Sequence, residues 1–419
     1  MRITLRSSCL AALLLATFCL LILLSKDNVG EVHSGPSLLA QGRLLKQEWL
    51  QALRNDDASK VNNEDRNNNN NNVDHLNLDP WGVSTPPPLP DEPIPTCERN
   101  GSMANVTGFA ALPANIQDFL FYRHCRHFRL LLDVPGKCGG SARASADVFL
   151  LLVIKSSPGN YERREVLRKT WARERLQAGK WVRRVFLVGT AGKDYDLQRN
   201  NKMLRLEQAE YGDILQWDFH DSFFNLTLKQ LLFLQWMDRS CPRARFLLNG
   251  DDDIFANTDN MVEYLSGLPD GNVGDKHLYV GHLIQWVGPI RQTWSKYYVP
   301  VQVFAPEKYP AYCGGGGFLL SGYTARVIHE MSHSIVLLPI DDVYLGMCLE
   351  KAKLKPVSHF GVRTAGMGVP STKVDSYHPC YYREILLVHR FLPHQIYLMW
   401  HRIHEPHLKC DGSEVSKVQ

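Results

Sequence analysis

The sequence predicts an α/β protein, in which the strands of a doubly wound, mostly parallel sheet alternate with flanking helices. Two observations predict this class. Between residues 147 and 249, short apolar runs alternate with stretches whose apolar residues recur at helical spacing. Three acidic residues, Asp251 to Asp253, directly follow the fourth apolar run. Because ligands bind beyond the carboxyl ends of strands in such sheets, these acids lie where a functional site is expected.

The elements of the sheet follow one another along the chain. The apolar run 147–156 predicts the first strand, and Val166, Leu167 and Trp171 give residues 161–176 the spacing of a helix. The same criteria predict a strand at 184–190, a helix at 201–213, a strand at 214–219, a helix at 225–240 and a strand at 245–249. This alternation favours a parallel sheet.

The N-terminus predicts a membrane anchor. Residues 7–24 are weakly polar to apolar and follow Arg2 and Arg6. The run is close to the ~20 residues that span a bilayer, and no small-x-small cleavage site follows it. Arginines before the run favour a cytoplasmic N-terminus. We expect a cytoplasmic tail at 1–6 and a single signal-anchor helix at 7–24; a cleaved signal peptide with secretion is the alternative.

The segment that follows the anchor predicts a stalk. It contains an Asn-rich tract at 62–72 and a Pro-rich tract at 84–95, neither of which can bury much apolar surface. Residues 38–53 have the pattern of a short amphipathic helix, for which a nascent helix of the stalk is favoured over a partner-binding helix. We therefore expect a disordered lumenal stalk at 25–96, which acts as a spacer, and a catalytic domain at 97–419.

Composition limits the partners and the compartment. The net charge of +4 and the lack of a Lys/Arg-rich run give no support for nucleic-acid binding, although a local basic cleft for an anionic ligand stays open. Of ten cysteines, Cys9 and Cys19 lie in the apolar run, which leaves eight beyond it. An even number in an exported domain suggests disulfides of unknown connectivity. Sequons at Asn100, Asn105 and Asn225 fit a glycosylating compartment.

The three acids at 251–253 predict a metal site. Carboxylates separated by one residue can place oxygen ligands around Mg²⁺ or Mn²⁺, which commonly shares its other positions with phosphate oxygens. The cation would neutralise a diphosphate as it leaves. A surface acidic loop without a metal is the alternative.

Three further stretches each allow two interpretations. The glycines Gly314, Gly315, Gly316 and Gly317 allow close approach to a ligand or form a tight loop. Asp341 and Asp342 precede an apolar helix, which one could cap while the other acts as a general base. His389 follows an apolar run and is by itself most typical of a core histidine.

These stretches together resemble a known family. The chain is similar to the β-1,3-galactosyltransferase and N-acetylglucosaminyltransferase family, and most similar to the N-acetyllactosaminide and core 1-extending β-1,3-N-acetylglucosaminyltransferases. The resemblance covers about residues 115 to 410 and lies in ordered motifs: FLFYRHCRHF, IKSSPGNYERREVLRKTWARER, YGDILQWDFHDSFFNLTLK, NGDDDIF, YPAYCGGGGFLLSG, PIDDVYLGMCLE and LLVHRFLP. The stalk and its Asn-rich tract are not part of it.

The resemblance implies a GT-A fold, a type II Golgi membrane protein and a UDP-sugar donor with Mn²⁺ or Mg²⁺. It implies that Asp251, Asp253 and His389 hold the metal, and that Asp342 is the catalytic base. The loop of four glycines would lie near the donor sugar and the acceptor. The residues matched to the donor-binding segments are Lys155, Ser156, Arg163, Arg164, Arg168, Asp213 and Asp252.

The implied reaction is an inverting transfer. N-acetylglucosamine would pass from UDP-N-acetylglucosamine to the 3-hydroxyl of a terminal β-galactose on glycoprotein or glycolipid glycans. The product would extend poly-N-acetyllactosamine or core 1 O-glycans. Asp342 would take the hydroxyl proton, and the metal would stabilise the departing UDP. A β-1,3-galactosyltransferase that uses UDP-galactose is the nearest alternative, and a non-catalytic lumenal sugar-binding protein is another.

The resemblance adds smaller expectations. A disulfide between Cys313 and Cys348 would brace the loop and helix beside the base. Asn225 would be a helix N-cap, a glycan site, or both, and glycosylation is favoured. A form secreted after cleavage in the stalk is compatible with the anchor. The acceptor and the oligomeric state stay open, including association with itself or with other glycosyltransferases.

Overall fold

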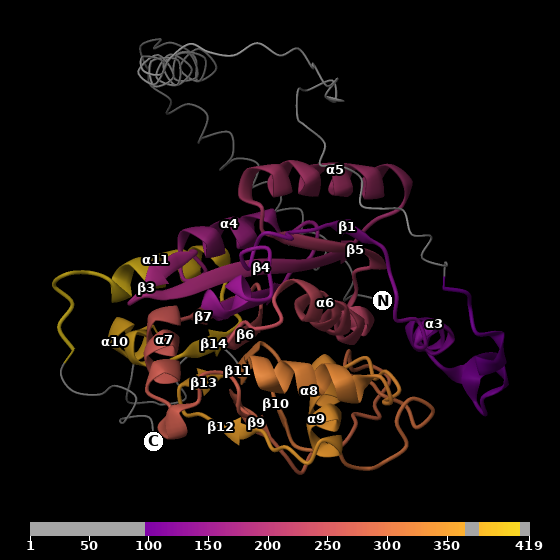
Figure 1. Cartoon of the computed structure of the whole chain (residues 1–419). Coiled ribbons are helices and arrows are strands. Elements are labelled where there is room, and N and C mark those ends of the chain that lie inside the picture. The colour runs from indigo at the N-terminus through magenta and orange to yellow at the C-terminus, as the bar shows by residue number, and fades with distance from the viewer. Residues whose placement is uncertain (1–96, 365–376, 411–419) are drawn as a thin grey trace, which may run out of the picture. The chain divides into compact units, whose positions relative to one another are not determined.

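A nine-stranded sheet forms the centre of the computed structural model, which describes residues 97–364 and 377–410 (Figure 1). The predicted tail, anchor, stalk and stalk helix lie outside the described residues. Within the described ranges, no helix is both long and apolar enough to cross a membrane. The α/β prediction is confirmed for the part of the chain that follows Cys97.

The middle of the sheet is parallel. Its strands lie in the order β5 (Ile214–His220), β4 (Lys180–Thr190), β2 (Val148–Lys155) and β6 (Phe246–Asp251). All eight residues of β2 are buried, which explains its unbroken apolar run, because a central parallel strand is covered on both faces. These four strands correspond to the four that the sequence predicts.

The flanking pairs are mostly antiparallel, so the sheet is mixed and not mostly parallel as predicted. Four pairs in the sheet are antiparallel: β1 with β5, β3 with β4, β11 with β6 and β8 with β11. The flanking strands are β1 (Leu130–Leu132), β3 (Arg175–Gln177), β8 (Tyr279–Gly281), β11 (Gly317–Ser321) and β12 (Val357–Ser358), of which β12 runs parallel to β8. Such short runs carry no sequence signal of strand direction.

Helices cover both faces of the sheet (Figure 1). One core contains buried residues of α6, α8 and α9 together with one face of the strands. The other contains buried residues of α4, α7 and α11. The helices are α3 (Ala114–Tyr122), α4 (Tyr161–Lys169), α5 (Asp194–Tyr211), α6 (Leu226–Ser240), α7 (Thr258–Ser266), α8 (Gly322–Ser332), α9 (Asp341–Lys351), α10 (Pro379–Glu384) and α11 (Pro393–Ile403). Short 3-10 helices lie at η1 (Gly101–Asn105), η2 (Phe109–Ala111), η3 (Ala144–Asp147), η4 (Phe223–Asn225) and η5 (Pro269–Gly271).

Two helix boundaries differ from the prediction. The helix expected at 161–176 ends at Lys169, because Thr170 leaves helical geometry with φ −120° and ψ −128°. Trp171 is then fully buried, and its indole N–H donates to the carbonyl of Ile254. Its place at helical spacing therefore reflects burial and not helix continuation. The second helix, α5, begins at Asp194 and not near residue 201.

Two smaller sheets complete the frame of the site. One is built from β13 (Val362–Arg363), β14 (Leu387–His389) and β7 (Ile254–Ala256), and the other pairs β9 (Leu283–Ile284) with β10 (Tyr312–Cys313). The strand β7 begins directly after the three acids and pairs with β14, which is distant in the sequence. The three-stranded sheet therefore brings β14 next to the acidic stretch.

In the part of the chain that the structure describes, six cysteines form disulfides: Cys97 with Cys125, Cys138 with Cys241, and Cys380 with Cys410. The prediction of a disulfide between Cys313 and Cys348 is wrong, because both are buried free thiols. The Cys313 thiol is directed at the carbonyl of Val357, 3.9 Å away. Burial raises the pKa of each of these thiols to about 12, so neither is a reactive thiolate at neutral pH.

Candidate active site

The site begins where β6 leaves the sheet. Asp251 is the last residue of β6, and in the parallel register it lies opposite Lys155, the last residue of β2. Asp252 and Asp253 form the turn before β7. The three acids therefore lie at the carboxyl end of two central strands, as the sequence predicts.

The pairing of β7 with β14 brings His389 to the acids. His389 lies opposite Ile254 in the antiparallel register, and the N–H of Phe391 donates to the carbonyl of Asp253 at 2.7 Å. Nε2 of His389 is 3.1 Å from Oδ1 of Asp253 and 3.8 Å from Oδ2 of Asp251. Ligand atoms of these three side chains lie within 4.8 Å of one another, so the structure brings together the three residues expected to hold a metal.

The chemistry of this group fits a divalent cation. Two carboxylates and one imidazole form a donor set that Mn²⁺ accepts. Oδ1 of Asp253 is buried and has no well-formed hydrogen bond, although the imidazole lies beside it. A buried acceptor left in this state is explained by a cation that would bind both groups. The metal itself remains a prediction.

The orientation of His389 suits the same role. Its Nδ1 lies 3.3 Å from the carbonyl of Thr364, to which it can donate, and this leaves Nε2 as an acceptor facing the acids. Burial would lower the pKa of His389, but the neighbouring Asp253 carboxylate and the charge of Asp251 hold it above its usual value. Burial would raise the pKa of Asp253, and His389 holds it below its usual value.

Asp252 has a different environment from its neighbours. Its Oδ2 accepts hydrogen bonds from the hydroxyl of Ser156 at 2.7 Å and from the amide of Asn160 at 2.8 Å. Arg163 is partly exposed, and its NH1 lies 3.7 Å from Oδ1 of Asp252 and 3.9 Å from Oδ2 of Asp253. Burial raises the pKa of Asp252 despite these partners. Asp252 is thus held by the protein, whereas Arg163 remains available to an anionic ligand.

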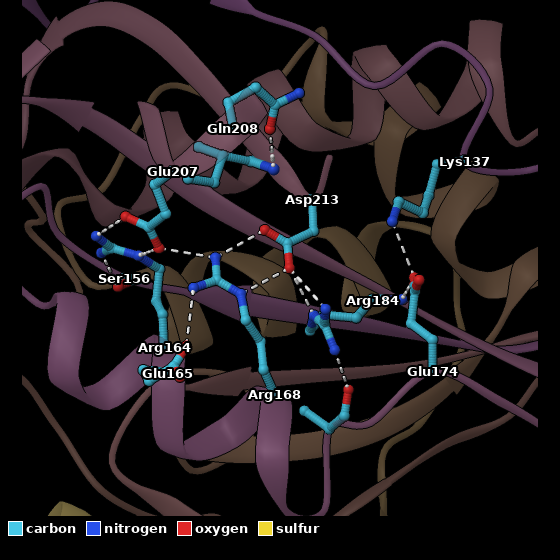
Figure 2. A network of polar contacts seen from close by, with 12 residues as sticks. Lys137, Ser156, Arg164, Glu165, Arg168, Glu174, Arg184, Glu207, Gln208 and Asp213 are labelled. Carbon is cyan, nitrogen blue, oxygen red and sulfur yellow. Dashed lines mark hydrogen bonds and ion pairs between the residues drawn. The ribbon is translucent and has the colours of Figure 1, made fainter. Parts of the chain in front are cut away.

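A buried ion network supports Ser156 from behind (Figure 2). Arg164 forms a two-pronged pair with Glu207 at 2.7 and 2.8 Å, and Arg168 also contacts Glu207 at 2.7 Å. Arg164 donates to the Ser156 hydroxyl at 3.0 Å. Because a guanidinium has no acceptor, the serine hydroxyl must direct its own proton to Asp252. The network therefore orients the Ser156 hydroxyl, which donates a hydrogen bond to Asp252 in the acidic turn.

Asp213 closes the far end of this network. Arg168 and Arg184 bind its carboxylate oxygens at 2.7 to 2.9 Å. Burial would raise the pKa of Asp213, but these two guanidinium groups hold it below its usual value. Asp213 has no exposed surface, so its expected contact with a donor is wrong. Arg164 and Arg168 are also buried and hold other side chains, which gives them a supporting position.

The two acids of α9 have separate partners. Asp341 is buried, and its Oδ2 lies 2.6 Å from Nζ of Lys155, which also contacts Asp251 at 3.1 Å. Ile340 is at the N-cap position of α9, so neither Asp341 nor Asp342 is the N-cap that the sequence allowed. Burial would lower the pKa of Lys155, but the two carboxylates raise it, so the lysine is a cation between them.

Asp342 is the partly exposed member of the pair. Its Oδ2 accepts from the N–H of Gly315 at 2.7 Å, and its Oδ1 accepts from the N–H of Val343 at 2.8 Å. Burial, followed by the charge of Asp341, raises the pKa of Asp342 to about 7, although both amides and Lys155 oppose the shift. A carboxyl group with this pKa can accept a proton near neutral pH.

The glycine loop connects the base to the metal-binding group. A Cβ on Gly316 would lie 2.7 Å from Cγ of His389, and Gly316 has φ +102°. A Cβ on Gly315 would lie 3.3 Å from Oδ2 of Asp342. Consecutive glycines therefore contact the imidazole and the base, so the loop is both tight and close to the site. Gly314 and Gly317 are likewise packed, against Thr364 and Leu387.

Sequence reasoning missed several supporting residues. Lys229 is buried, and its Nζ donates to the carbonyl of Ser156 at 2.6 Å and to Asp221 at 2.9 Å. A single lysine within the apolar helix 225–240 was the available signal. Asn160, Glu207 and Thr364 carried no comparable local signal, because their roles depend on contacts with distant segments.

The predicted sequons lie at different exposures. Asn105 is exposed on η1, and Asn100 is half-buried and accepts a hydrogen bond from the Ser102 hydroxyl at 2.7 Å. Asn225 is at the N-cap position of α6 but makes no capping hydrogen bond there, and its amide donates to the carbonyl of His220 at 2.8 Å. Glycosylation at all three remains a prediction.

Comparisons with known proteins agree with these observations. The family model described as galactosyltransferase matches residues 162–359. The human N-acetyllactosaminide β-1,3-N-acetylglucosaminyltransferase 3 is 55% identical over 332 residues, which cover 79% of this chain and 87% of that protein. The human acetylgalactosaminyl-O-glycosyl-glycoprotein β-1,3-N-acetylglucosaminyltransferase is 50% identical, with 79% and 85% covered. The rat UDP-GlcNAc:βGal β-1,3-N-acetylglucosaminyltransferase 7 is 43% identical, with 75% and 77% covered. The chain therefore belongs to the galactosyltransferase family, together with these β-1,3-N-acetylglucosaminyltransferases.

Proposed function

We propose that this protein transfers N-acetylglucosamine from UDP-N-acetylglucosamine to the 3-hydroxyl of terminal β-galactose on glycans. The names of its relatives support this donor and this linkage. The observation that carries the proposal is the pair of consecutive glycines. Gly315 is bonded to the proposed base, and Gly316 lies against the imidazole of the metal-binding group, so a donor and an acceptor could meet between them.

Asp342 performs the proton transfer in this proposal. Its carboxylate accepts the proton of the acceptor 3-hydroxyl while the hydroxyl oxygen bonds to the anomeric carbon and the bond from that carbon to the diphosphate breaks. The α-linked donor gives a β-linked product because a single displacement inverts the carbon. The amides of Gly315 and Val343 fix the carboxylate so that it faces the acceptor.

Positive charge stabilises the leaving UDP. A divalent cation held by Asp251, Asp253 and His389 would act as the Lewis acid for the diphosphate. Arg163 lies beside the same acids with part of its side chain exposed and can bind a phosphate oxygen. Lys155 neutralises Asp251 and Asp341, which keeps the site from repelling an anionic donor.

The proposal includes a GT-A fold for the catalytic domain and a location in the Golgi membrane. A parallel centre that ends in the acidic turn, followed by the antiparallel strand β11, supports a GT-A fold. We also propose the topology expected from the sequence: a signal-anchor at 7–24, a stalk at 25–96 and a lumenal catalytic domain, in the Golgi membrane. The three disulfides support an oxidising compartment.

The test is a donor and acceptor assay on the full chain with its disulfides formed. UDP-N-acetylglucosamine and UDP-galactose are each offered with Mn²⁺ and with lactosamine or core 1 acceptors. We expect transfer of N-acetylglucosamine, with a β-1,3 linkage seen by NMR of the product. Transfer of galactose instead would assign the protein to the galactosyltransferase alternative. Binding of UDP without transfer of either sugar would contradict the proposed reaction.

A further inference from the structure

A cavity of about 970 Å³ lies at the carboxyl end of β5 and has no role in the reaction described above. Residues of α3, β5, η4 and the start of α6 line it, together with Leu337 from the segment before α9. This volume lies within the range of ligand-binding pockets, roughly 300–1,000 Å³. The cavity shares an edge of the sheet with the site, because both lie at carboxyl ends of parallel strands.

The lining combines aromatic surface with balanced charge. The aromatic side chains are Phe119, Tyr122, Phe128, Phe219 and Phe224, and Tyr122 is 41% exposed. The charges of Asp118 and Asp218 are offset by those of Arg123 and Arg129. An aromatic face with both hydrogen-bond donors and acceptors, and no net charge from acids and arginines, suits a neutral ligand that is rich in hydroxyl groups.

Several polar groups of the cavity are available for such a ligand. Asp118, Arg129 and Asp218 are exposed, and within the described ranges their side chains have no hydrogen-bond or ion-pair partner. Carboxylates accept hydrogen bonds from hydroxyl groups, and a guanidinium donates to hydroxyl oxygens. The cavity can therefore bind a polyol by direct hydrogen bonds without first breaking internal ones.

The cavity lies within reach of the proposed base. Leu337 precedes Asp342 by five residues, so at most about 18 Å of chain separates them. The hydroxyl of Thr227, at the start of α6, donates to the carbonyl of Leu338 at 2.6 Å and holds this connection in place. Phe223 of η4 also contacts Tyr297, with ring centroids 5.4 Å apart, in the segment that leads to the glycine loop.

We infer that this cavity binds the saccharide units that precede the terminal galactose of the acceptor glycan. The inference rests on the proposed function, because that function places the terminal galactose at Asp342. The rest of the acceptor must then leave the site, and the cavity offers neutral polar and aromatic surface within the length of a short oligosaccharide. Longer glycans would bind more tightly than the terminal disaccharide alone.

The test compares acceptor lengths in the full chain. The acceptors are the N-acetyllactosamine disaccharide and a hexasaccharide of the same repeat on the same aglycon. Tyr122→Ala and Arg129→Ala should each raise KM for the hexasaccharide about fivefold, the value of one lost contact of about 1 kcal/mol. The kcat and the disaccharide KM should not change. Matched controls on α5, Tyr195→Ala and Arg205→Ala, change exposed side chains outside the cavity and should behave as wild type.

The outcomes separate this inference from the proposed function. Suppose that the wild type transfers to the disaccharide, and that the cavity variants change KM for both acceptors equally or for neither. The inference is then overturned and the proposed function stands. If the wild type transfers to neither, the function fails, and saturation-transfer NMR with the hexasaccharide still reports on the cavity. Hexasaccharide signals that weaken in both cavity variants would then support binding there, and unchanged signals would overturn it.

Two other occupants give distinct results. Asn225 lines the cavity and is a predicted glycan site. The protein's own glycan is the occupant if the cavity variants lower thermal stability in the wild-type background but not in the Asn225→Gln background. In that case the KM values for both acceptors should stay unchanged. The cavity holds the carrier peptide if the variants raise KM for a glycopeptide that carries one disaccharide but do not change KM for the free hexasaccharide. Either result overturns the inference.

Discussion

Asp341 and Asp342 are neighbours in the chain, yet their carboxylates have different surroundings. Asp341 is buried against Lys155, which neutralises it, whereas Asp342 is partly exposed and held only by two backbone amides and the nearby lysine charge. Desolvation without a close counter-ion raises a carboxyl pKa, and a close counter-ion lowers it. This difference in surroundings is why Asp342, and not Asp341, is the general base in the proposed mechanism.

Asp342→Asn should abolish transfer without loss of UDP binding. The amide keeps the size and one acceptor oxygen but cannot take the acceptor proton, so kcat should fall by about 10²- to 10⁴-fold, the usual contribution of a general base. UDP affinity, measured by calorimetry with Mn²⁺, should stay within about twofold. Loss of UDP binding along with transfer would assign Asp342 a structural role. Asp341→Asn is the matched control: it should retain transfer at about pH 8 and lower the free energy of unfolding, because it leaves Lys155 without one carboxylate. It should also lower the pKa of Asp342, because it removes the neighbouring negative charge.

The pH dependence of kcat/KM should follow the same carboxyl group. Its pKa is raised to about 7, so the base is protonated and inactive below that pH and ionised above it. The rate should therefore rise as pH increases through about 7 and level off above. A pH profile measured on the wild type at saturating Mn²⁺ checks this. A rate that is flat from about pH 5.5 to 8 would exclude Asp342 as the titrating base.

At the scale of elements, the site depends on two junctions of different predictability. The end of β6 is visible in the sequence, because a buried apolar run stops at three acids. The pairing of β14 with β7 is not, because His389 and Ile254 are distant in the chain and each lies in an ordinary short apolar run. His389 is predicted as a metal ligand from the family resemblance alone. The register of β14 against β7 explains why its side chain lies beside the acids.

The hydroxyl of Ser156, the residue after β2, links Asp252 of the acidic turn to Arg164 of α4. Ser156→Ala should lower UDP affinity severalfold, because Asp252 loses a donor and Arg164 loses an acceptor, and both groups are buried. Ser156→Thr, which keeps the hydroxyl, is the control and should bind UDP nearly as the wild type does. Calorimetric titration of UDP with Mn²⁺ distinguishes the two. Equal affinities in both variants would show that the network does not act through this hydroxyl.

Gly316 of the glycine loop lies against the ring of His389 and leaves no room for a side chain. Gly316→Ala places a methyl group against the His389 ring and requires an alanine at φ +102°. The ring should move, so Mn²⁺ affinity should fall by about tenfold, the lower end for disturbed metal-ligand positioning. Thermal unfolding without metal should show only a modest change. Gly179→Ala, also at positive φ but with open space around its Cβ, is the matched control for backbone strain. Unchanged metal affinity in Gly316→Ala would contradict the role of the loop.

At the scale of the molecule, the sequence predicts the alternating order of elements and the position of the acids. It does not predict strand direction outside the centre, because β8, β11 and β12 are too short to show it. Nor does it show that Arg164, Arg168 and Asp213 belong to one buried network through Glu207, since charged residues in a motif can equally contact a ligand. The cysteine pairing likewise depends on distances that only the fold sets.

The proposed mechanism requires that Asp251, Asp253 and His389 hold a divalent cation, which binds the diphosphate of the donor. Calorimetric titration of UDP into the wild type, with and without Mn²⁺, tests it most directly, with Asp253→Asn and His389→Gln measured in parallel. We expect UDP binding that requires Mn²⁺ in the wild type and is lost in both variants, while circular dichroism shows that they remain folded. Equal UDP affinity with and without Mn²⁺, or variants that bind UDP as the wild type does, would show that these three residues do not hold a cation for the donor.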